Sequence, residues 1–253
     1  MISVILLGTG NVATHLISAF SKAKKVELKQ VYGRKKSSLK QIDKNINTTT
    51  NLADLEDADV YIIAISDDII AKFSSQLQLK NKLVVHTSGS VSLQSLQCSA
   101  NKGVFYPLQT FSKKHKVNFN EVPICIEAEN KKDLSLLKKL ASSISDKVYP
   151  IDSEQRKYLH ISAVFTNNFV NKLYSIGYDI CSQNKIPFEV LQPLILESAK
   201  KIAVNSPADI QTGPAYRNDT KIISNHLKLL SGNEKKIYKL LTESIQKTHG
   251  KKL

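Results

Sequence analysis

The alternation of apolar and polar residues divides the chain into two parts. Up to about residue 152, short apolar runs alternate with amphipathic stretches, a pattern typical of a doubly wound α/β sheet. We predict strands at residues 2–7, 28–32, 45–49, 59–65, 83–86, 103–106, 123–126 and 148–151. Helical spacing follows the first strand and recurs at residues 67–77, 93–98 and 131–143.

Beyond residue 152, helical periodicity replaces the strand-like runs. It predicts one long helix from Glu154 to about Asn184, a second opened by Pro187, and two final helices at 218–230 and 234–248. We therefore predict a Rossmann-type doubly wound domain over residues 1–152, followed by an all-helical domain over residues 153–253.

Composition limits the classes of partner. The net charge of +14 raises the possibility of nucleic-acid binding. However, the lysines are spread along the chain with few interleaved aromatic residues, which favours solvated helix faces. We expect no nucleic-acid partner, although a positive field attracts an anionic cofactor or substrate. We also expect a cytoplasmic protein without a membrane contact, because no apolar run is long enough to span a membrane and no basic leader precedes the first strand. We expect no metal site, because the three cysteines lack the spacing of metal ligands, and their odd number fits a reducing compartment.

A glycine turn joins the first predicted strand to the first predicted helix. It reads Gly8-Thr9-Gly10-Asn11-Val12-Ala13, and strand, glycine turn and helix in that order are what a dinucleotide fingerprint requires. The glycines allow a tight turn and close approach of the backbone to a pyrophosphate, which the helix N-terminus attracts. We predict cofactor contacts from Gly8, Thr9, Gly10, Asn11 and Val12. A turn that merely packs an α/β domain is the alternative.

The end of the second predicted strand distinguishes the two nicotinamide cofactors. An NAD site places an acid there, whereas this chain reads Val31-Tyr32-Gly33-Arg34-Lys35-Lys36-Ser37. Arg34 can form paired, charge-assisted hydrogen bonds to a 2′-phosphate, with help from Lys35 or Lys36 and from Ser37. We predict NADP, bound by Arg34 and Lys35; a basic surface turn is the alternative.

This layout resembles the β-hydroxyacid dehydrogenase-like superfamily, which includes pyrroline-5-carboxylate reductase, prephenate dehydrogenase and 6-phosphogluconate dehydrogenase. The resemblance implies a 6-phosphogluconate dehydrogenase-like helical domain. Residues 58–67 are similar to the fourth-strand segment of the group, whose following loop lies beside the cofactor, and this implies cofactor contacts from Ile65 and Ser66.

Three further motifs resemble an uncharacterised group of Rossmann-like NADP oxidoreductases that carry a C-terminal domain of unknown function. They are His86-Thr87-Ser88-Gly89-Ser90, Tyr106-Pro107-Leu108-Gln109-Thr110-Phe111 and Gly213-Pro214-Ala215-Tyr216-Arg217-Asn218-Asp219. The resemblance implies fold and cofactor class, and the reaction only generically.

Candidate chemistry lies in these motifs. The segment after residue 86 leaves a buried strand at the sheet edge where doubly wound folds bind ligands, so we predict that Thr87 contacts the cofactor and Ser88 the substrate. Capping of a helix at 91–96 by Ser90 or Ser92 is the alternative. The stretch that begins at Tyr106 resembles a segment that reads His-Pro-Met in prephenate dehydrogenases, so Tyr106 takes the place of the histidine. A tyrosine is a poorer proton carrier than a histidine near neutral pH. A ring packed under the cofactor or in the core is the alternative.

The long helix supplies a proton donor. His160 and Asn167 share a helical face, and related dehydrogenases carry Lys or His and Asn on this helix. No lysine is present here, so His160 is the candidate acid, and a hydrogen-bonded structural histidine is the alternative. Arg217 is predicted to pair with a substrate carboxylate, while Asp219 orients a neighbour or caps a helix.

Together these features predict an NADP-dependent oxidoreductase that transfers hydride between nicotinamide and a carbonyl or imine of a small substrate. The substrate is expected between the domains, and the helical domain is expected to form a homodimer. A dinucleotide-binding sensor without turnover, and a deazaflavin cofactor, are the alternatives.

Overall fold

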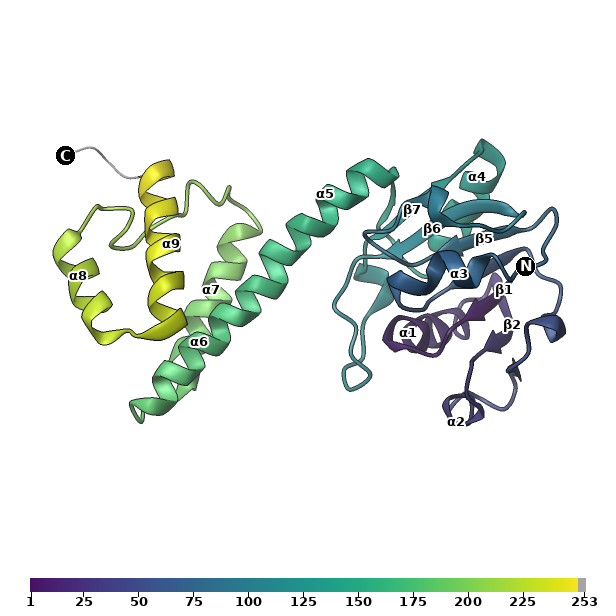
Figure 1. The fold of residues 1–253 in the computed structure, drawn as a ribbon, viewed down its shortest axis with the longest axis horizontal. Coiled ribbons are helices and arrows are strands. Elements are labelled where there is room, and N and C mark those ends of the chain that lie inside the picture. Colours follow the sequence, from purple (N-terminus) through teal and green to yellow (C-terminus); the bar gives the residue numbers. More distant parts are fainter. Residues whose placement is uncertain (250–253) are drawn as a thin grey trace. The chain divides into compact units, whose positions relative to one another are not determined.

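The computed structural model describes residues 1–249, and within them one mixed sheet carries the first half of the chain (Figure 1). Its order is β3-β2-β1-β4-β5-β6-β7-β8, and neighbouring strands are parallel except for the antiparallel pair β6 and β7. The bounds are β1 Ile2–Leu7, β2 Val26–Tyr32, β3 Asn47–Thr49, β4 Val60–Ile63, β5 Leu83–His86, β6 Asn101–Pro107, β7 Ile124–Ala128 and β8 Val148–Pro150. The predicted Rossmann-type sheet is confirmed.

Both faces of the sheet are covered, because alternate residues of its strands point into two separate cores. In β4, Val60 and Ile62 pack with α1 (Asn11–Phe20) and α4 (Lys131–Ala141). Tyr61 and Ile63 of the same strand pack with α3 (Ile70–Ser74) on the other face. This burial on both sides explains why the central strands read as continuous apolar runs rather than as alternating ones.

The predicted helix at residues 93–98 is wrong. Only a short 3₁₀ turn forms there, Leu93–Ser95, and the Ser92 side chain caps it by accepting from the Gln94 amide at 3.3 Å. Leu96, Cys98 and Ala100 then enter the core at alternate positions, as an extended chain does. The other short elements are α2 Lys36–Leu39 and 3₁₀ turns at Leu52–Asp54, Asp67–Ile69 and Phe119–Glu121.

The second half of the chain is helical, as predicted. α5 (Ser153–Ala163) continues through a π-helical segment, Val164–Phe169, into α6 (Val170–Gln183). A 3₁₀ turn at Phe188–Leu191, α7 (Gln192–Ile202), α8 (Thr220–Leu229) and α9 (Gly232–His249) follow. Residues 250–253 of the predicted helical domain lie outside the described residues.

Contacts group the chain into two compact units, one covering Met1–Val164 and the other starting at Phe165. The whole of α5 thus groups with the sheet. Among the described residues, no helix is both long enough and apolar enough to cross a membrane.

Candidate functional site

One cavity of about 520 Å³ lies at the carboxyl ends of β1, β2 and β4. All ten residues predicted to contact the cofactor line it: Gly8, Thr9, Gly10, Asn11, Val12, Arg34, Lys35, Ile65, Ser66 and Thr87. Separate stretches of sequence therefore meet at the point where strand order reverses, next to β1, which is where doubly wound folds bind their ligands.

The two glycines of the turn have different local environments. Gly8 has φ +140°, and a Cβ atom there would lie 2.1 Å from the carbonyl oxygen of Ala64, so the turn itself requires glycine. Gly10 has φ −75°, which any residue adopts, and beyond the adjoining chain no protein atom lies within 4 Å of its Cβ position. The space above Gly10 is therefore open to a ligand.

The start of α1 is suited to an anion. No side chain caps the helix at Gly10, and its first turn holds no acidic residue. Backbone amides at this end carry the positive pole of the helix dipole. The open space above Gly10 thus lies at a site that favours phosphate.

The far side of the cavity is basic. Arg34, Lys35 and Ser38 line it just beyond β2, and no aspartate or glutamate is among its lining residues. Lys36 and Ser37, which the sequence also offered for this role, are not lining residues; the short helix α2 begins at Lys36, and Ser38 takes the hydroxyl position.

The loop after β5 is held by a carboxylate. The hydroxyls of Ser88 and Ser90 both donate to Asp67 Oδ2 at 2.7 Å. Ser88 Oγ also accepts from the amides of Ser90 and Val91, and the residue is only 4% exposed. Its hydroxyl therefore shapes the loop, and Ser90 is the more exposed of the two hydroxyl residues.

His86, at the end of β5, is completely buried. Its Nδ1 accepts from the Ser88 amide at 3.2 Å, and its Nε2 has no hydrogen-bond partner. Burial, followed by the positive charge of Arg156, lowers the pKa of His86 to about 4. The imidazole is neutral at physiological pH and serves the loop structurally.

His160 and Tyr106 form a pair beside this loop. His160 Nδ1 lies 3.3 Å from the hydroxyl oxygen of Tyr106, with the rings edge to face. A Cβ on Gly89 would lie 2.7 Å from His160 Nδ1 and 2.8 Å from the Tyr106 hydroxyl, so glycine is needed for the pair to form. Burial raises the pKa of Tyr106 to about 12, and the hydroxyl keeps its proton.

A buried ion pair fixes the helix that carries His160. Arg156, 1% exposed, contacts Glu127 of β7 at 2.5 Å and donates to the Val91 carbonyl at 2.6 Å. Ser153 also donates to Glu127, at 2.8 Å. Arg156 and His160 are four residues apart on α5, so this anchor sets the position of the imidazole one turn later.

Asn167 and Arg217 belong to the second unit. Asn167 lies in the π-helical segment, and Arg217 is exposed in the loop before α8. Asp219 caps α8, accepting from the Ile222 amide at 3.1 Å, which is the alternative the sequence offered for it.

Three residues of the site were missed in the sequence: Asp67, Glu127 and Arg156. Asp67 offered a signal, since it is an acid directly after a buried strand at the ligand-binding edge. Glu127 and Arg156 offered none, because their pairing joins a strand to a helix 29 residues later.

Two family models match the chain. The one described as "NADP oxidoreductase coenzyme F420-dependent" matches residues 3–89, and the one described as "Domain of unknown function (DUF2520)" matches residues 122–245. No curated protein matches it.

Solved structures match over nearly the whole chain. A "putative NADP oxidoreductase" from Bacteroides fragilis is 38% identical, with a TM-score of 0.87, covering 97% of this chain and 98% of that one. A 1-pyrroline-5-carboxylate reductase from Streptococcus pyogenes shares the fold at 15% identity and a TM-score of 0.68, covering 98% of both chains. An imine reductase from Myxococcus stipitatus in complex with NADP⁺ does so at 15% identity and 0.63, covering 98% of this chain and 96% of the other.

Proposed function

Because the chain belongs to the NADP oxidoreductase family of the Bacteroides fragilis protein, we propose that it is an NADP-dependent oxidoreductase acting on the carbonyl or imine of a small substrate. The proposal rests on one observation: the same cavity is lined by a glycine turn, by the N-terminus of a helix that no side chain caps, and by basic residues without an aspartate or glutamate among them. This arrangement fits a dinucleotide with a third phosphate.

The residues fit NADP from end to end. The α1 amides and the open space at Gly10 would hold the pyrophosphate, and Arg34 with Lys35 would hold the 2′-phosphate, where a carboxylate would repel it. Ile65, Ser66 and Thr87 line the part of the cavity formed by β4 and β5. The bound nicotinamide would supply the hydride.

His160 is the proposed proton donor. In the imidazolium form, Nδ1–H donates to the Tyr106 hydroxyl, and the Nε2 proton passes to the substrate oxygen or nitrogen as the carbon is reduced. The neutral ring that remains keeps its Nδ1 hydrogen bond. Tyr106 is a positioning residue, since its hydroxyl oxygen can accept from Nδ1–H both in the imidazolium and in the neutral ring that remains after the Nε2 proton has left.

The remaining site residues enter as proposals. Ser88 orders the loop against Asp67, and we assign substrate contact from that loop to Ser90 as well as to Ser88. Arg217 would pair with a substrate carboxylate and Asn167 would donate a hydrogen bond to the substrate. We also propose a domain boundary near residue 152 and membership of the β-hydroxyacid dehydrogenase-like superfamily. We further propose a cytoplasmic location, which agrees with the three cysteines being free and buried.

Homodimerisation through the helical unit is supported by its thin core. Among its described residues, the buried apolar ones are only Cys181, Ala215 and Ile223, and each of them keeps 7–9% of its surface exposed. By contrast, Leu194 and Leu196 of α7 are 64% and 60% exposed, and many other large apolar side chains are exposed nearby in sequence. Monomeric proteins rarely leave such surfaces uncovered. Light scattering should give a dimer mass, and Leu194→Asp should lower it towards the monomer; a monomeric wild-type chain would contradict the proposal.

Cofactor titration tests the function directly. Wild-type protein should bind NADPH more tightly than NADH, and Arg34→Ala should lose about tenfold to a hundredfold of that preference, as expected for paired charged hydrogen bonds. Lys36→Ala is the matched control, because it removes a positive charge from the same turn outside the cavity. Equal affinity for both cofactors would overturn the assignment of NADP. Binding without reduction of any carbonyl or imine in a broad panel would favour a sensor.

A further inference from the structure

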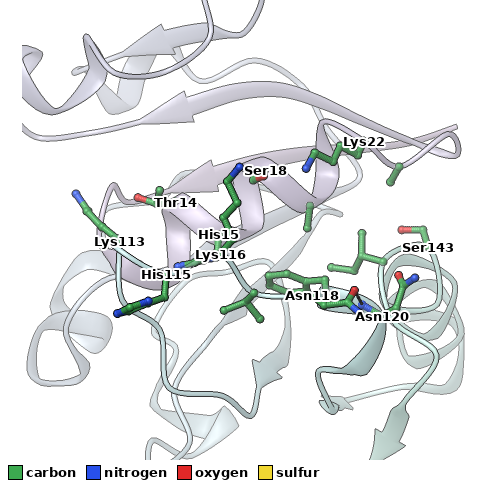
Figure 2. A pocket seen from close by; sticks show the side chains of 15 residues that line it. Thr14, His15, Ser18, Lys22, Lys113, His115, Lys116, Asn118, Asn120 and Ser143 are labelled. Carbon is green, nitrogen blue, oxygen red and sulfur yellow. Dashed lines mark hydrogen bonds between the residues drawn. The ribbon is translucent and has the colours of Figure 1, made fainter.

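A second cavity, of about 660 Å³, lies against the outer face of α1. Its other walls are the loop between β6 and β7 and the turn after α4, and Figure 2 shows the side chains of α1 facing that loop. It shares no lining residue with the dinucleotide cavity. The proposed function therefore gives this cavity no role.

Positive charge is concentrated in this cavity. Lys22, Lys113 and Lys116 line it together with the imidazoles of His15 and His115, and no aspartate or glutamate is among the lining residues. Within the described part of the chain, none of the three lysines forms an ion pair. Ammonium groups that share a hollow without a counter-charge repel one another, and a bound anion relieves this repulsion.

Most of the remaining lining is apolar or carries amide groups. Ala19, Phe119 and Ile144 contribute hydrocarbon surface, and Asn118 and Asn120 contribute side-chain amides. Asn118 is partly engaged, since its amide donates to Glu121 Oε1 at 3.2 Å, and that glutamate is not a lining residue. Cationic groups beside an apolar wall suit a ligand with a charged end and a hydrophobic body.

We propose that this cavity binds a small phosphate ester with an apolar body. Three lysines match the double negative charge of a phosphate monoester better than the single charge of a carboxylate. The phosphate would lie at Lys116, between Lys113 at the Thr14 end of the cavity and Lys22 at its other end (Figure 2), and the apolar body against Phe119 and Ile144.

The same loop is attached to the dinucleotide site. Asn11, which lines the dinucleotide cavity, donates from Nδ2 to the Phe111 carbonyl at 3.2 Å, and His15 Nε2 donates to the Ser112 carbonyl at 3.0 Å. The Phe111 ring stacks on Phe119, at the wall of the second cavity, with centroids 5.9 Å apart. A ligand that holds the loop in this arrangement also holds Asn11, so phosphate ester and NADPH should each tighten binding of the other.

Calorimetric titration with phenyl phosphate in the presence of saturating NADPH tests the proposal. Under these conditions NADPH fills the dinucleotide cavity, so a phosphate probe has to bind elsewhere. We expect saturable binding that weakens with added salt, and at least about tenfold weaker binding for phenol and for inorganic phosphate, each of which lacks one half of the ligand.

Two double variants locate the site. Lys113→Ser with Lys116→Ser should weaken phenyl phosphate binding about tenfold or more, whereas Lys131→Ser with Lys132→Ser, which removes the same charge from exposed positions of α4, should not. Equal effects of the two pairs would mean general charge attraction and would overturn the proposal. So would loss of phenyl phosphate binding on addition of NADPH, which would place the probe in the dinucleotide cavity.

Discussion

Replacing each glycine of the fingerprint by alanine should separate folding from cofactor binding. At Gly8 the new methyl group would lie 2.1 Å from the Ala64 carbonyl oxygen, in a backbone conformation with φ +140°. Clash and backbone strain together should cost about 3–5 kcal/mol, which is about 6–20 °C in Tm for a chain of this size. At Gly10 the backbone has φ −75° and the methyl group meets no protein atom within 4 Å. Stability should therefore stay within about 1 kcal/mol of wild type.

The order of effects reverses for binding. The Gly10→Ala methyl group would occupy the space that we assign to the pyrophosphate, and displacing the phosphates from the α1 amides by even about 3 kcal/mol weakens binding about a hundredfold. Thermal unfolding measures the first effect, and fluorescence titration with NADPH measures the second on the same samples. Wild-type NADPH affinity in a folded Gly10→Ala protein would refute the placement of the pyrophosphate. A Gly8→Ala protein as stable as wild type would refute the steric argument.

Three further predictions concern the network around His160. Because the pKa of His86 falls from 6.5 to about 4 on folding, the unfolded chain takes up a proton before the folded chain does as the pH drops. The free energy of unfolding should keep its full value above about pH 6.5 and be about 3 kcal/mol lower near pH 4. Urea unfolding across this range measures the fall, which should be shallower in His86→Gln. Glu127→Ala leaves the Arg156 charge buried without its partner and should lower the free energy of unfolding by about 3–5 kcal/mol. Glu154→Ala breaks an exposed ion pair with Lys157 and should change the free energy of unfolding by less than about 1 kcal/mol. Equal losses in the two variants would contradict the role of burial. Tyr106→Phe should lower kcat about tenfold and shift the pH profile of kcat while NADPH affinity is unchanged; an unaltered profile would remove Tyr106 from the positioning of His160.

The residues of the proposed cofactor site were largely predictable, because their signals are local. A strand, a glycine turn and a helix are consecutive in sequence, and the basic turn at Arg34 directly follows a strand whose place beside β1 is set by the right-handed crossover of parallel strands. Each prediction needed only the nearest neighbours in the chain. The helix expected at 93–98 failed for the converse reason, since burial of Leu96 and Cys98 against the sheet overrode their local spacing.

The substrate side of the site was only partly predictable. The sequence marked His160 and Ser88 as polar residues on promising elements, and it left open whether each has a structural or a chemical role. The structure shows that the Ser88 hydroxyl donates to Asp67, and it gives His160 a partner in Tyr106. Both contacts join residues more than twenty positions apart, which no local pattern encodes.

The sequence by itself thus determined most of the strands, the glycine turn and the sign of the charge beyond the second strand, because each follows from residues adjacent along the chain. The order of the strands in the sheet, with its antiparallel pair β6 and β7, came from the tertiary structure. Only the tertiary structure decided which polar groups meet: Glu127 with Arg156, Asp67 with two serines, and Gly89 beneath the Tyr106–His160 pair. Hydrogen bonds and buried charges act over a few ångströms, so these partners exist only once the sheet and α5 have been packed together.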